Sequence, residues 1–293
     1  MKQPVVTVVG SINMDLTIST NTIPAQGETV LGNHFHTYPG GKGANQAVAA
    51  SRLGAHVNMI GAVGNDVFGK GLLDHLHREG IHTNGIRTFN HVGTGTATII
   101  LSDQDNRIIV AQGANKEVTP ELVSEEEAII AESDILLMQL EIPIETVEYT
   151  LSMANSHEIP VIINPAPYQP MSENILLKAA YLTPNQLEWK QLSKHHNLEN
   201  RLDQFVITQG RYGAVLYQKG EKRRLPAHLV SVEDTTGAGD AFNGALAAQL
   251  AEGADLEQAV TLANAAAALS ITKQGAQTGM PSRNEVEAFL KTQ

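Results

Sequence analysis

The chain has 293 residues and a formal net charge of −11 at pH 7, from 31 Asp and Glu against 20 Lys and Arg. This acidic balance argues against a nucleic-acid partner, because phosphate backbones are bound by dense Lys and Arg. The absence of cysteine excludes disulfides, thiol nucleophiles and zinc sites built on thiolates. No apolar run approaches the ~18 residues of a membrane span, and no signal-peptide core is present. We therefore expect a cytoplasmic protein with its own core and no membrane partner.

Alternating strands and helices open the chain. Residues 5–9 are β-branched and almost entirely apolar, which predicts a strand covered on both faces. A polar alternating segment follows at 29–38, then a helix at 43–53, a strand at 56–63 and a helix at 68–79. This alternation is typical of a parallel sheet with helices on both faces.

A different pattern occupies residues 94–112. β-rich runs at 97–101 and 107–111 flank a polar turn at 102–106, which predicts a hairpin. Together with the polar strands around residues 12–38, this hairpin could form a small sheet that stands off the main one. We interpret that small sheet as a lid over a binding site.

Strand and helix alternation then resumes, and the last third is mostly helical. We find no internal repeat or linker, so we expect one domain over residues 1–293, with lid strands inserted at about 12–38 and 94–112. The predicted fold is α/β, a three-layer, doubly wound and mostly parallel central sheet flanked by helices. The remaining predicted elements are strands at 135–139, 160–163, 181–183 and 204–208, antiparallel edge strands at 213–218 and 222–226, and helices at 143–156, 186–200, 241–251, 256–272 and 283–290.

The loop from Asp234 to Asp240 precedes the predicted helix at 241–251. Gly237 and Gly239 allow close approach, and the helix aims unpaired N–H groups back at the loop. The result is a local anion site at the positive end of the helix dipole. Asp and Thr here could be only cap and turn residues. In phosphoryl transfer, by contrast, an Asp would accept the proton of the attacking hydroxyl.

A second glycine-dense loop runs from Pro39 to Ala47 and enters a helix. It is not a Walker A loop, because Lys42 is followed by Gly43, and it lacks the third glycine of a dinucleotide fingerprint. Its backbone would let a polyhydroxylated ligand come close, with Lys42 and Asn45 as donors. A purely structural loop fits the same residues equally well.

Polar residues also follow several predicted strands, at the sheet edge where ligands bind in open α/β folds. Asn13 and Asp15 face one side of an extended chain and could hold vicinal hydroxyls. Glu141 follows another strand, and Asn185 with Glu188 begins a helix. Each of these features alone is also explained as a strand end, a cap or a first-turn acid.

Taken in order, these motifs resemble those of the ribokinase-like carbohydrate kinases. Residues 40–47 are similar to the first signature of that family and residues 234–240 to the second, about 190 residues further on. The resemblance extends from Gly10 to about Pro281, which is nearly the whole chain.

This resemblance implies that Asp240 is the catalytic base, that ATP is the phosphoryl donor, and that Gly237, Ala238 and Gly239 form the anion hole. It implies a magnesium ion held by Glu188 through water, and a potassium ion as activator. The implied sugar-binding residues are Asn13, Met14, Asp15, Gly41, Lys42, Gly43, Asn45, Glu141 and Asp240. The implied ATP-binding residues are Asn185, Thr208, Gln209, Gly210, Arg211, Tyr212, Gly213, Gly239, Asp240 and Asn264, and the implied potassium ligands are Asp234, Thr236, Ser270, Lys273, Gly275 and Gly279.

The sequence favours phosphorylation of D-ribose at its 5-hydroxyl, since Asn13, Asp15 and Glu141 suit a compact, hydroxyl-rich pentose. The alternatives are a kinase for deoxyribose, fructose or adenosine, or a sugar sensor without catalysis. The resemblance is incomplete at Gly279, where the family commonly has a serine, and at Gln186, where it often has an acid. An exposed edge of the lid strands further predicts a homodimer.

Overall fold

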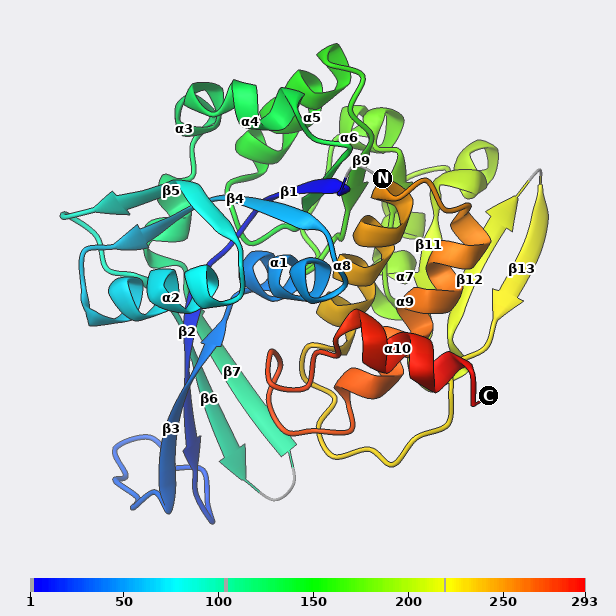
Figure 1. The fold of residues 1–293 in the computed structure, drawn as a ribbon. Helices are drawn as coiled ribbons and strands as arrows, with labels where there is room; N and C mark the ends of the chain where they lie inside the picture. The colour runs from blue at the N-terminus through cyan, green and yellow to red at the C-terminus, as the bar shows by residue number, and fades with distance from the viewer. Residues whose placement is uncertain (1–2, 103–104, 219, 293) are drawn as a thin grey trace.

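A computed structural model describes residues 3–102, 105–218 and 220–292. Within these residues, the central sheet has six parallel strands in the order β10-β9-β8-β1-β4-β5 (Figure 1). The strand predicted to be covered on both faces is β1, in the interior of this sheet. The six strands are β1 (Val5–Val9), β4 (His56–Gly64), β5 (His82–Phe89), β8 (Ile135–Met138), β9 (Val161–Ile163) and β10 (Tyr181–Leu182).

Helices cover both faces of the central sheet, so the predicted three-layer, doubly wound α/β fold is confirmed. One face carries α1 (Lys42–Arg52), α2 (Val67–Arg78), α8 (Ala238–Ala251), α9 (Leu256–Ser270) and α10 (Arg283–Leu290). The other carries α3 (Pro120–Glu125), α4 (Glu127–Ala131), α5 (Ile144–Ser156), α6 (Glu173–Lys178) and α7 (Gln186–His195).

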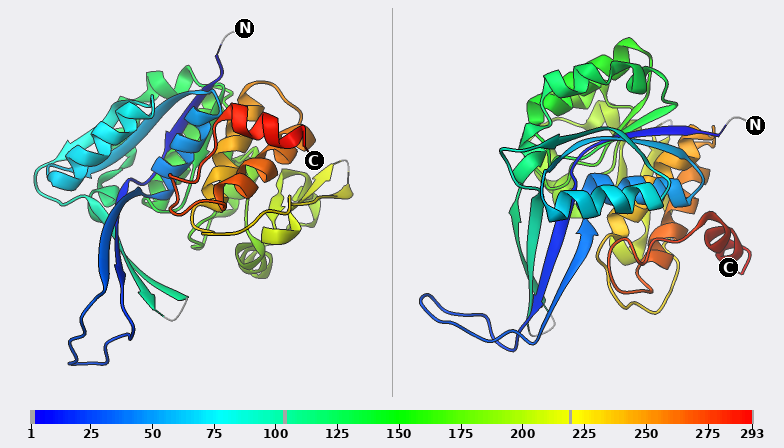
Figure 2. Two further views of the ribbon diagram at one scale, coloured as in Figure 1. Left: turned by 60° about the horizontal axis from the view of Figure 1, so that its bottom comes forward. Right: turned by 60° about the vertical axis from the view of Figure 1, so that its left-hand side comes forward.

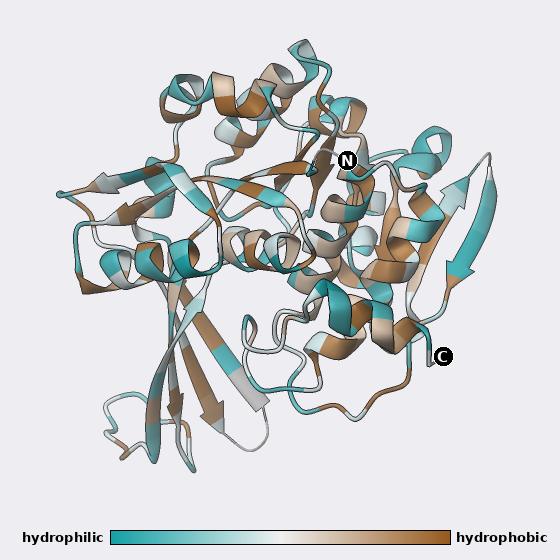
Figure 3. Cartoon of the chain, viewed as in Figure 1, coloured by the Kyte–Doolittle hydropathy of each residue, from teal (hydrophilic) through white to brown (hydrophobic). Residues whose placement is uncertain are grey.

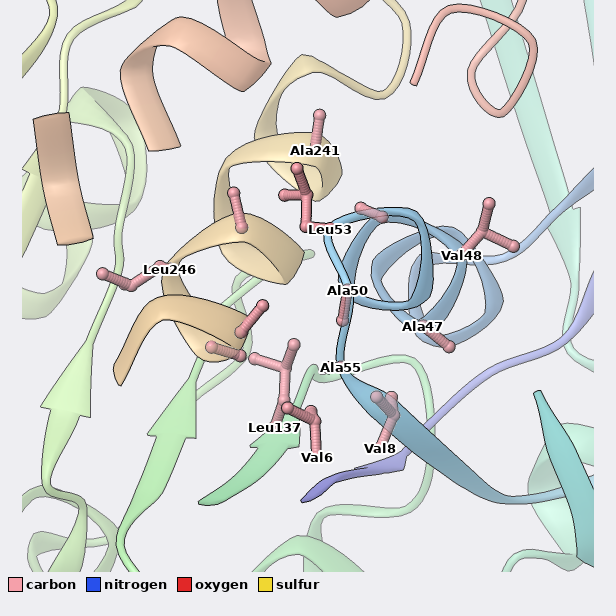
Figure 4. Close-up of a cluster of buried hydrophobic side chains, with 14 of the residues drawn as sticks. Val6, Val8, Ala47, Val48, Ala50, Leu53, Ala55, Leu137, Ala241 and Leu246 are labelled. Atoms are coloured by element: carbon pink, nitrogen blue, oxygen red, sulfur yellow. The ribbon is translucent and has the colours of Figure 1, made fainter. Parts of the chain in front are cut away.

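The core is divided between these two faces by the alternation of side chains along each strand. Val8 and Leu137 pack against α1 and α8 on one face (Figure 4), whereas Val9 and Leu136 belong to the cluster on the other face. Each fully buried side chain of this size contributes ~1.5–3 kcal/mol through the hydrophobic effect. Small alanines on α1 and α8 let the two helices approach closely, which brings their N-terminal ends together.

A small four-stranded sheet projects from the layered body, as Figure 2 shows. Its order is β3-β2-β6-β7, and β2 and β6 pair in parallel while the two outer pairs are antiparallel. The predicted hairpin is therefore present, although residues 103 and 104 of its turn lie outside the described residues. The strands are β2 (Asn13–Ser19), β3 (His34–Gly40), β6 (Gly95–Ser102) and β7 (Asp105–Ala111).

A third sheet contains β11 (Val206–Thr208), β12 (Ala214–Gln218) and β13 (Glu221–Leu225) in antiparallel order. An isolated parallel bridge between Leu182 and Phe205 joins it to the edge of the central sheet, as the predicted edge strands require. Short 3-10 helices complete the described chain at η1 (Gly113–Glu117), η2 (Glu199–Gln204) and η3 (Gly210–Tyr212).

Several predicted boundaries were wrong. The polar segment at 29–38 becomes a strand only from His34, because earlier residues form a loop beyond the end of β2. The helix predicted at 241–251 begins at Ala238, since Gly237 adopts a left-handed conformation and ends the preceding loop. Strand β5 was not predicted, because a polar edge strand lacks a continuous apolar run. The short helices α3, α4 and α6 were also missed.

The central sheet and the small sheet both contain hydrophobic residues (Figure 3), but they differ in how far these residues are covered. Hydrophobic residues occupy the buried strands of the central sheet, and they recur along β6 and β7 of the small sheet. There they are not covered, since Ile108 is 53% exposed and Ile109 is 65% exposed. No helix in the described part of the chain is both long enough and apolar enough to cross a membrane.

Candidate active site

The candidate site lies where the carboxyl ends of β1 and β8 meet the N-termini of α1 and α8. Glu141, just beyond β8, joins two of these elements through one oxygen. Its Oε2 accepts hydrogen bonds from Ser11 Oγ at 2.5 Å and from the backbone N–H of Lys42 at 3.1 Å. The negative carboxylate thereby caps the positive end of α1. The structure thus brings Glu141 and the first glycine-dense loop together, although they are about 100 residues apart.

Asp240 lies in the first turn of α8 and is 6% exposed. Both of its carboxylate oxygens accept side-chain amide hydrogen bonds from α1. Asn45 Nδ2 donates to Oδ2 at 2.9 Å, and Gln46 Nε2 donates to Oδ1 at 2.9 Å. Gln277 in turn donates from Nε2 to Asn45 Oδ1 at 2.8 Å. Since amide N–H groups only donate, these two hydrogen bonds hold the carboxylate in a single orientation.

Gly237 caps α8 in a left-handed conformation, with φ 79° and ψ 0°. A side chain at this position would be strained, and a Cβ would lie 2.8 Å from the Cβ of Ala276. The N–H of Ala238 donates to Thr235 O at 3.3 Å, a long hydrogen bond. An anion at this helix end would therefore compete with Thr235 for the Ala238 N–H, while the helix dipole favours its negative charge.

Asp15 lies on β2 and faces the other acids of the site. Its pKa is raised from 3.8 to about 7, mainly by burial and then by the nearby charges of Glu141 and Asp240, against the opposing effect of Lys42. The pKa of Lys42 is also raised, mainly by Asp240 and against the effect of burial, with smaller contributions from Glu141, Glu188 and Asp15. One lysine thus faces four carboxyl groups. The negative charge of these groups exceeds the positive charge of the lysine, so an additional cation would be favoured in the site.

Asn13 precedes Asp15 on β2 and is 3% exposed. Its Oδ1 accepts a hydrogen bond from Asn115 Nδ2 at 2.7 Å, and Asn115 Oδ1 accepts one from the N–H of Ile12 at 2.9 Å. Asn115 therefore holds the segment that presents Asn13, while leaving the Asn13 amide donors for a ligand. Sequence reasoning missed Asn115, because nothing near residue 115 indicates a contact about 100 residues away.

Two loops meet around Asp234, the first residue of the second signature. Its Oδ1 accepts from the N–H of Thr236 at 2.9 Å and its Oδ2 from the N–H of Gly275 at 2.8 Å. Burial acts to raise the pKa of Asp234, but hydrogen bonds from Thr236 and Gly275 outweigh it and hold the pKa below its ordinary value. Of the residues implied as potassium ligands, Asp234, Thr236 and Gly275 are thus brought together, and a Cβ on Gly279 would collide with the carbonyl oxygen of Ser270. In this backbone, Gly279 cannot be exchanged for serine without a local shift.

Most of the residues implied in ATP binding, Asn185 and residues 208–213, lie at the junction of the central and third sheets. Asn185 and Glu188 form a capping box at the start of α7, and Asn185 bridges to Thr208 at the end of β11. Burial raises the pKa of Glu188, although the Asn185 N–H and Lys42 lower it. Residues 210–212 form η3, which begins at Gly210 and is followed by Gly213, both with positive φ. Asn264 instead donates to the carbonyl oxygens of Leu225 and Pro226, at 3.2 and 3.3 Å.

A cavity of about 1010 Å³ opens between the small sheet and the two loops around Asp234. Its lining includes Asp15, Tyr38, Asp234, Thr236 and Gly275. The cavity therefore connects one implied sugar residue with three of the implied cation ligands. Asn185 and Thr208 do not line this cavity. A nucleotide bound next to Asn185 and Thr208 would therefore reach the site from the side of the third sheet.

Comparisons with known proteins agree with this geometry. A family model described as pfkB family carbohydrate kinase matches residues 3–283. Ribokinase of Bacillus subtilis (strain 168) is 46% identical over 288 residues, covering 97% of this chain and 98% of that protein. Deoxyribokinase of Salmonella typhi is 31% identical over 300 residues, covering 97% of this chain and 98% of that protein.

The solved structure of Arabidopsis thaliana ribokinase complexed with ribose and ATP matches with a TM-score of 0.92 at 31% identity. The match covers 99% of each chain. The fold, the site and these relatives agree, and the chain belongs to the pfkB family of carbohydrate kinases.

Proposed function

We propose that the protein is an ATP-dependent ribokinase, which transfers the γ-phosphoryl group of ATP to the primary 5-hydroxyl of D-ribose and yields D-ribose 5-phosphate and ADP. The observation that carries this proposal is the buried Asp240 carboxylate at the N-terminus of α8, held by two amide donors beside a glycine cap. A carboxylate and a helix end in this arrangement suit a base next to an anion site. The 46% identity to Bacillus subtilis ribokinase supports the choice of ribose.

In the proposed reaction, Asp240 accepts the proton of the sugar 5-hydroxyl as its oxygen attacks the γ-phosphorus of ATP. The N–H groups at the start of α8 stabilise the negative charge of the transferred group. Asn13, Asp15 and Lys42 bind and orient the sugar. The small sheet helps to exclude water, because its strands wall the cavity above Asp15.

We propose that magnesium binds at this site together with ATP. In the described residues, no group of three His, Cys, Asp or Glu side chains is arranged to hold a metal ion. Glu188 is 8% exposed, and burial raises its pKa, so nearby positive charge would stabilise its ionised form. We propose that Glu188 holds magnesium through water while the phosphates supply further oxygens, as is usual for this ion. The ion would neutralise phosphate charge.

We propose a potassium site between the Asp234 loop and the loop at 270–279. Asp234 is held ionised by the hydrogen bonds that lower its pKa, and backbone carbonyls lie nearby. Oxygen donors of this kind suit a large monovalent cation. With Gly279 in place of a serine, carbonyl oxygens replace the side-chain ligand. The proposed ligands are Asp234 and Thr236, with carbonyl oxygens of Ser270, Lys273, Gly275 and Gly279.

We also propose that the protein is a homodimer through the exposed strands of the small sheet. β7 is an edge strand, and Ile108, Ile109 and Val110 on it are exposed. A second copy would cover this apolar surface and the unpaired edge. The cytoplasmic location expected from the sequence stays a prediction.

A panel of acceptor sugars tests the proposed function. The purified protein is given ATP, magnesium and potassium with ribose, 2-deoxyribose, fructose or adenosine, and ADP release is measured for each. We expect kcat/KM to be highest for ribose, since Asn13 and Asp15 can hold vicinal hydroxyls. Preference for 2-deoxyribose, the substrate named for the Salmonella relative, would retain the kinase and contradict the choice of sugar. ATP consumption that no acceptor stimulates would contradict the function as a whole.

A further inference from the structure

Gln46 follows Asn45 on α1 and has none of the roles assigned above. Its side chain is completely buried, and its Nε2 donates to Asp240 Oδ1 at 2.9 Å. The same nitrogen donates to Asn164 Oδ1 at 3.1 Å, and Gln46 Oε1 accepts from Gln139 Nε2 at 2.7 Å. All the polar atoms of this amide are therefore used, and one of its hydrogens contacts the proposed base.

One backbone carbonyl fixes the direction of these hydrogen bonds. The carbonyl oxygen of Thr183 can only accept, and Asn164 Nδ2 donates to it at 3.2 Å. Asn164 Oδ1 is therefore turned toward Gln46, which must present Nε2 to it and to Asp240. Reversing either amide would place two donors or two acceptors face to face. The donor end of Gln46 is thus fixed toward Asp240.

The residues behind Gln46 come from the carboxyl ends of neighbouring strands of the central sheet. Gln139, Asn164 and Thr183 each follow a strand of the central sheet, namely β8, β9 and β10, which are neighbours in the sheet. Gln139 Oε1 has no hydrogen-bond partner among the described residues, and a Cβ on Gly10 would collide with it. An unpaired buried oxygen is costly, so packing alone does not account for a glutamine here. The hydrogen bond from Gln139 Nε2 to Gln46 accounts for the glutamine at this position.

Thr183, which follows β10, also helps to hold the backbone of α8. Thr183 Oγ1 donates to Asn243 Oδ1 at 2.6 Å, and Asn243 Nδ2 donates to the carbonyl oxygen of Gly239 at 2.8 Å. That carbonyl belongs to the peptide that joins Gly239 to Asp240. The sheet therefore fixes the base twice, at its carboxylate through Gln46 and at its backbone through Asn243.

We infer that Gln46 is a positioning residue for phosphoryl transfer, and that with Gln139 and Asn164 behind it, it holds the Asp240 carboxylate toward the acceptor hydroxyl. The inference rests on the proposed function. Gln46 does not need to touch either substrate, so its loss should affect the reaction and leave binding intact. Misplacement of a reacting group by 1 Å can cost ~100-fold in rate.

The first test replaces Gln46 by methionine, which has a similar volume and no donor. We expect Gln46→Met to lower kcat for ribose ~100-fold, while calorimetric Kd values for ribose and ATP stay within ~2-fold of wild type. The matched control is Gln249→Met, because Gln249 is a buried glutamine of α8 that donates to Glu252 at 3.0 Å, away from the base. This control should keep the wild-type kcat. An unchanged kcat in Gln46→Met would overturn the inference.

The second test asks whether Gln46 acts through Asp240. In an Asp240→Asn background, Gln46→Met should produce no further loss of residual turnover, since residues that act as a unit are not additive. A further ~100-fold loss would show a separate role and overturn the inference. Should Gln46→Met fail to fold, Gln46→Glu keeps the shape and turns a carboxylate oxygen toward Asp240. We expect at least the same loss of kcat there, and a wild-type kcat would overturn the inference.

Failure of the proposed function has a different outcome. A wild-type enzyme that prefers another sugar leaves the test intact, with that sugar as acceptor. A wild-type enzyme without any sugar-dependent ATP consumption ends the proposed function and the inference together. Normal wild-type activity with an unaffected Gln46→Met ends the inference alone.

Discussion

Asp15 lies where burial and neighbouring carboxylates act in the same direction. Its pKa is raised to about 7 by burial, then by Glu141 and Asp240, against the effect of Lys42. In the ligand-free protein, Asp15 therefore keeps its proton at pH 5 and loses most of it at pH 8. A carboxylate of this kind is costly in the empty site, and hydroxyl donors from a bound sugar would lower that cost.

Because of this raised pKa, the free energy of unfolding should fall as pH rises. An unfolded Asp loses its proton near pH 3.8, but the folded one keeps it to about pH 7. Between these values the folded state binds more protons, so stability declines across this window and is level above it. Asp15→Asn has no proton to lose. Relative to wild type it should gain stability between pH 4 and pH 7, by up to about 4 kcal/mol.

Urea unfolding at pH 5 and pH 8 measures this difference. Asp74→Asn, on the exposed side of α2, serves as the control and should differ from wild type by the same amount at both pH values. A difference between Asp15→Asn and wild type that stays constant from pH 5 to pH 8 would contradict the raised pKa.

Asp240→Asn should fold and bind ribose but lose turnover, with a lower melting temperature because its NH2 group faces the donor of Asn45 or Gln46. Asparagine keeps the shape of the side chain and cannot accept the proton of the attacking hydroxyl, so kcat should fall ~100- to 10,000-fold. ADP release gives kcat, while the melting temperature and the calorimetric Kd for ribose report folding and binding. Turnover near the wild-type value would refute Asp240 as the base.

At the residue scale, motifs predicted only part of the site. Asp240, Lys42 and Asp15 lie in or beside recognisable glycine loops and strand ends, so sequence pointed to them. Gln277 and Asn115 lie in no such pattern. Gln277 contacts Asn45 across 232 positions of the chain, and only the folded topology brings these two side chains together. Hydrogen-bond partners of this kind leave no local periodicity to read.

The packing of α1 against α8 sets the distance between the amide donors and the base. At Gly244 on α8, a Cβ would lie 2.5 Å from Ala49 Cβ and 2.5 Å from the carbonyl oxygen of Gln46. A single methyl group would therefore push the two helices apart. Because Asn45 and Gln46 reach Asp240 across this interface, helix spacing and catalytic geometry are coupled.

Gly244→Ala should lower both stability and activity. We expect a loss of ~1–3 kcal/mol in the free energy of unfolding, typical of an overpacked core, together with a lower kcat. Gly71→Ala is the matched control, since Gly71 lies in α2 with no atom within 4 Å of a Cβ there. It should gain ~0.5–1 kcal/mol and keep its kcat. Urea unfolding and ADP release measure both quantities, and an unaltered Gly244→Ala would show that the helices can separate freely.

At the element scale, sequence patterns predicted best where one signal dominated. The apolar run of β1 and the periodic pattern of α10 were located correctly, because burial on two faces or on one helical face leaves a clear period. β5 begins with the polar residues His82, Thr83 and Asn84 and lies at the edge of the sheet. It was missed because its parallel pairing with β4 leaves no local pattern in the sequence. The start of α8 depended on the conformation of Gly237, which the sequence alone does not specify.

At the scale of the whole molecule, the small sheet exposes apolar residues on an edge strand. Ile109→Lys on β7 should convert a dimer into a monomer, because a buried charge in the proposed interface would be costly. Analytical ultracentrifugation at micromolar concentration measures the mass. Val67→Lys is the control, since Val67 is 79% exposed at the start of α2, and this variant should stay dimeric. A wild-type protein that sediments as a monomer would contradict the proposed dimer.

The chain crosses between the small sheet and the layered body four times, and each crossing contains a crowded glycine. Gly10, Gly41, Gly95 and Gly113 all have neighbouring atoms closer to a built Cβ than real side chains tolerate. The far end of the small sheet is open, with residues 27–29 exposed. Tolerance to substitution should therefore change abruptly along this part of the chain. A library of single substitutions should show sharp intolerance at these four glycines, whereas most replacements at residues 27–29 should be accepted.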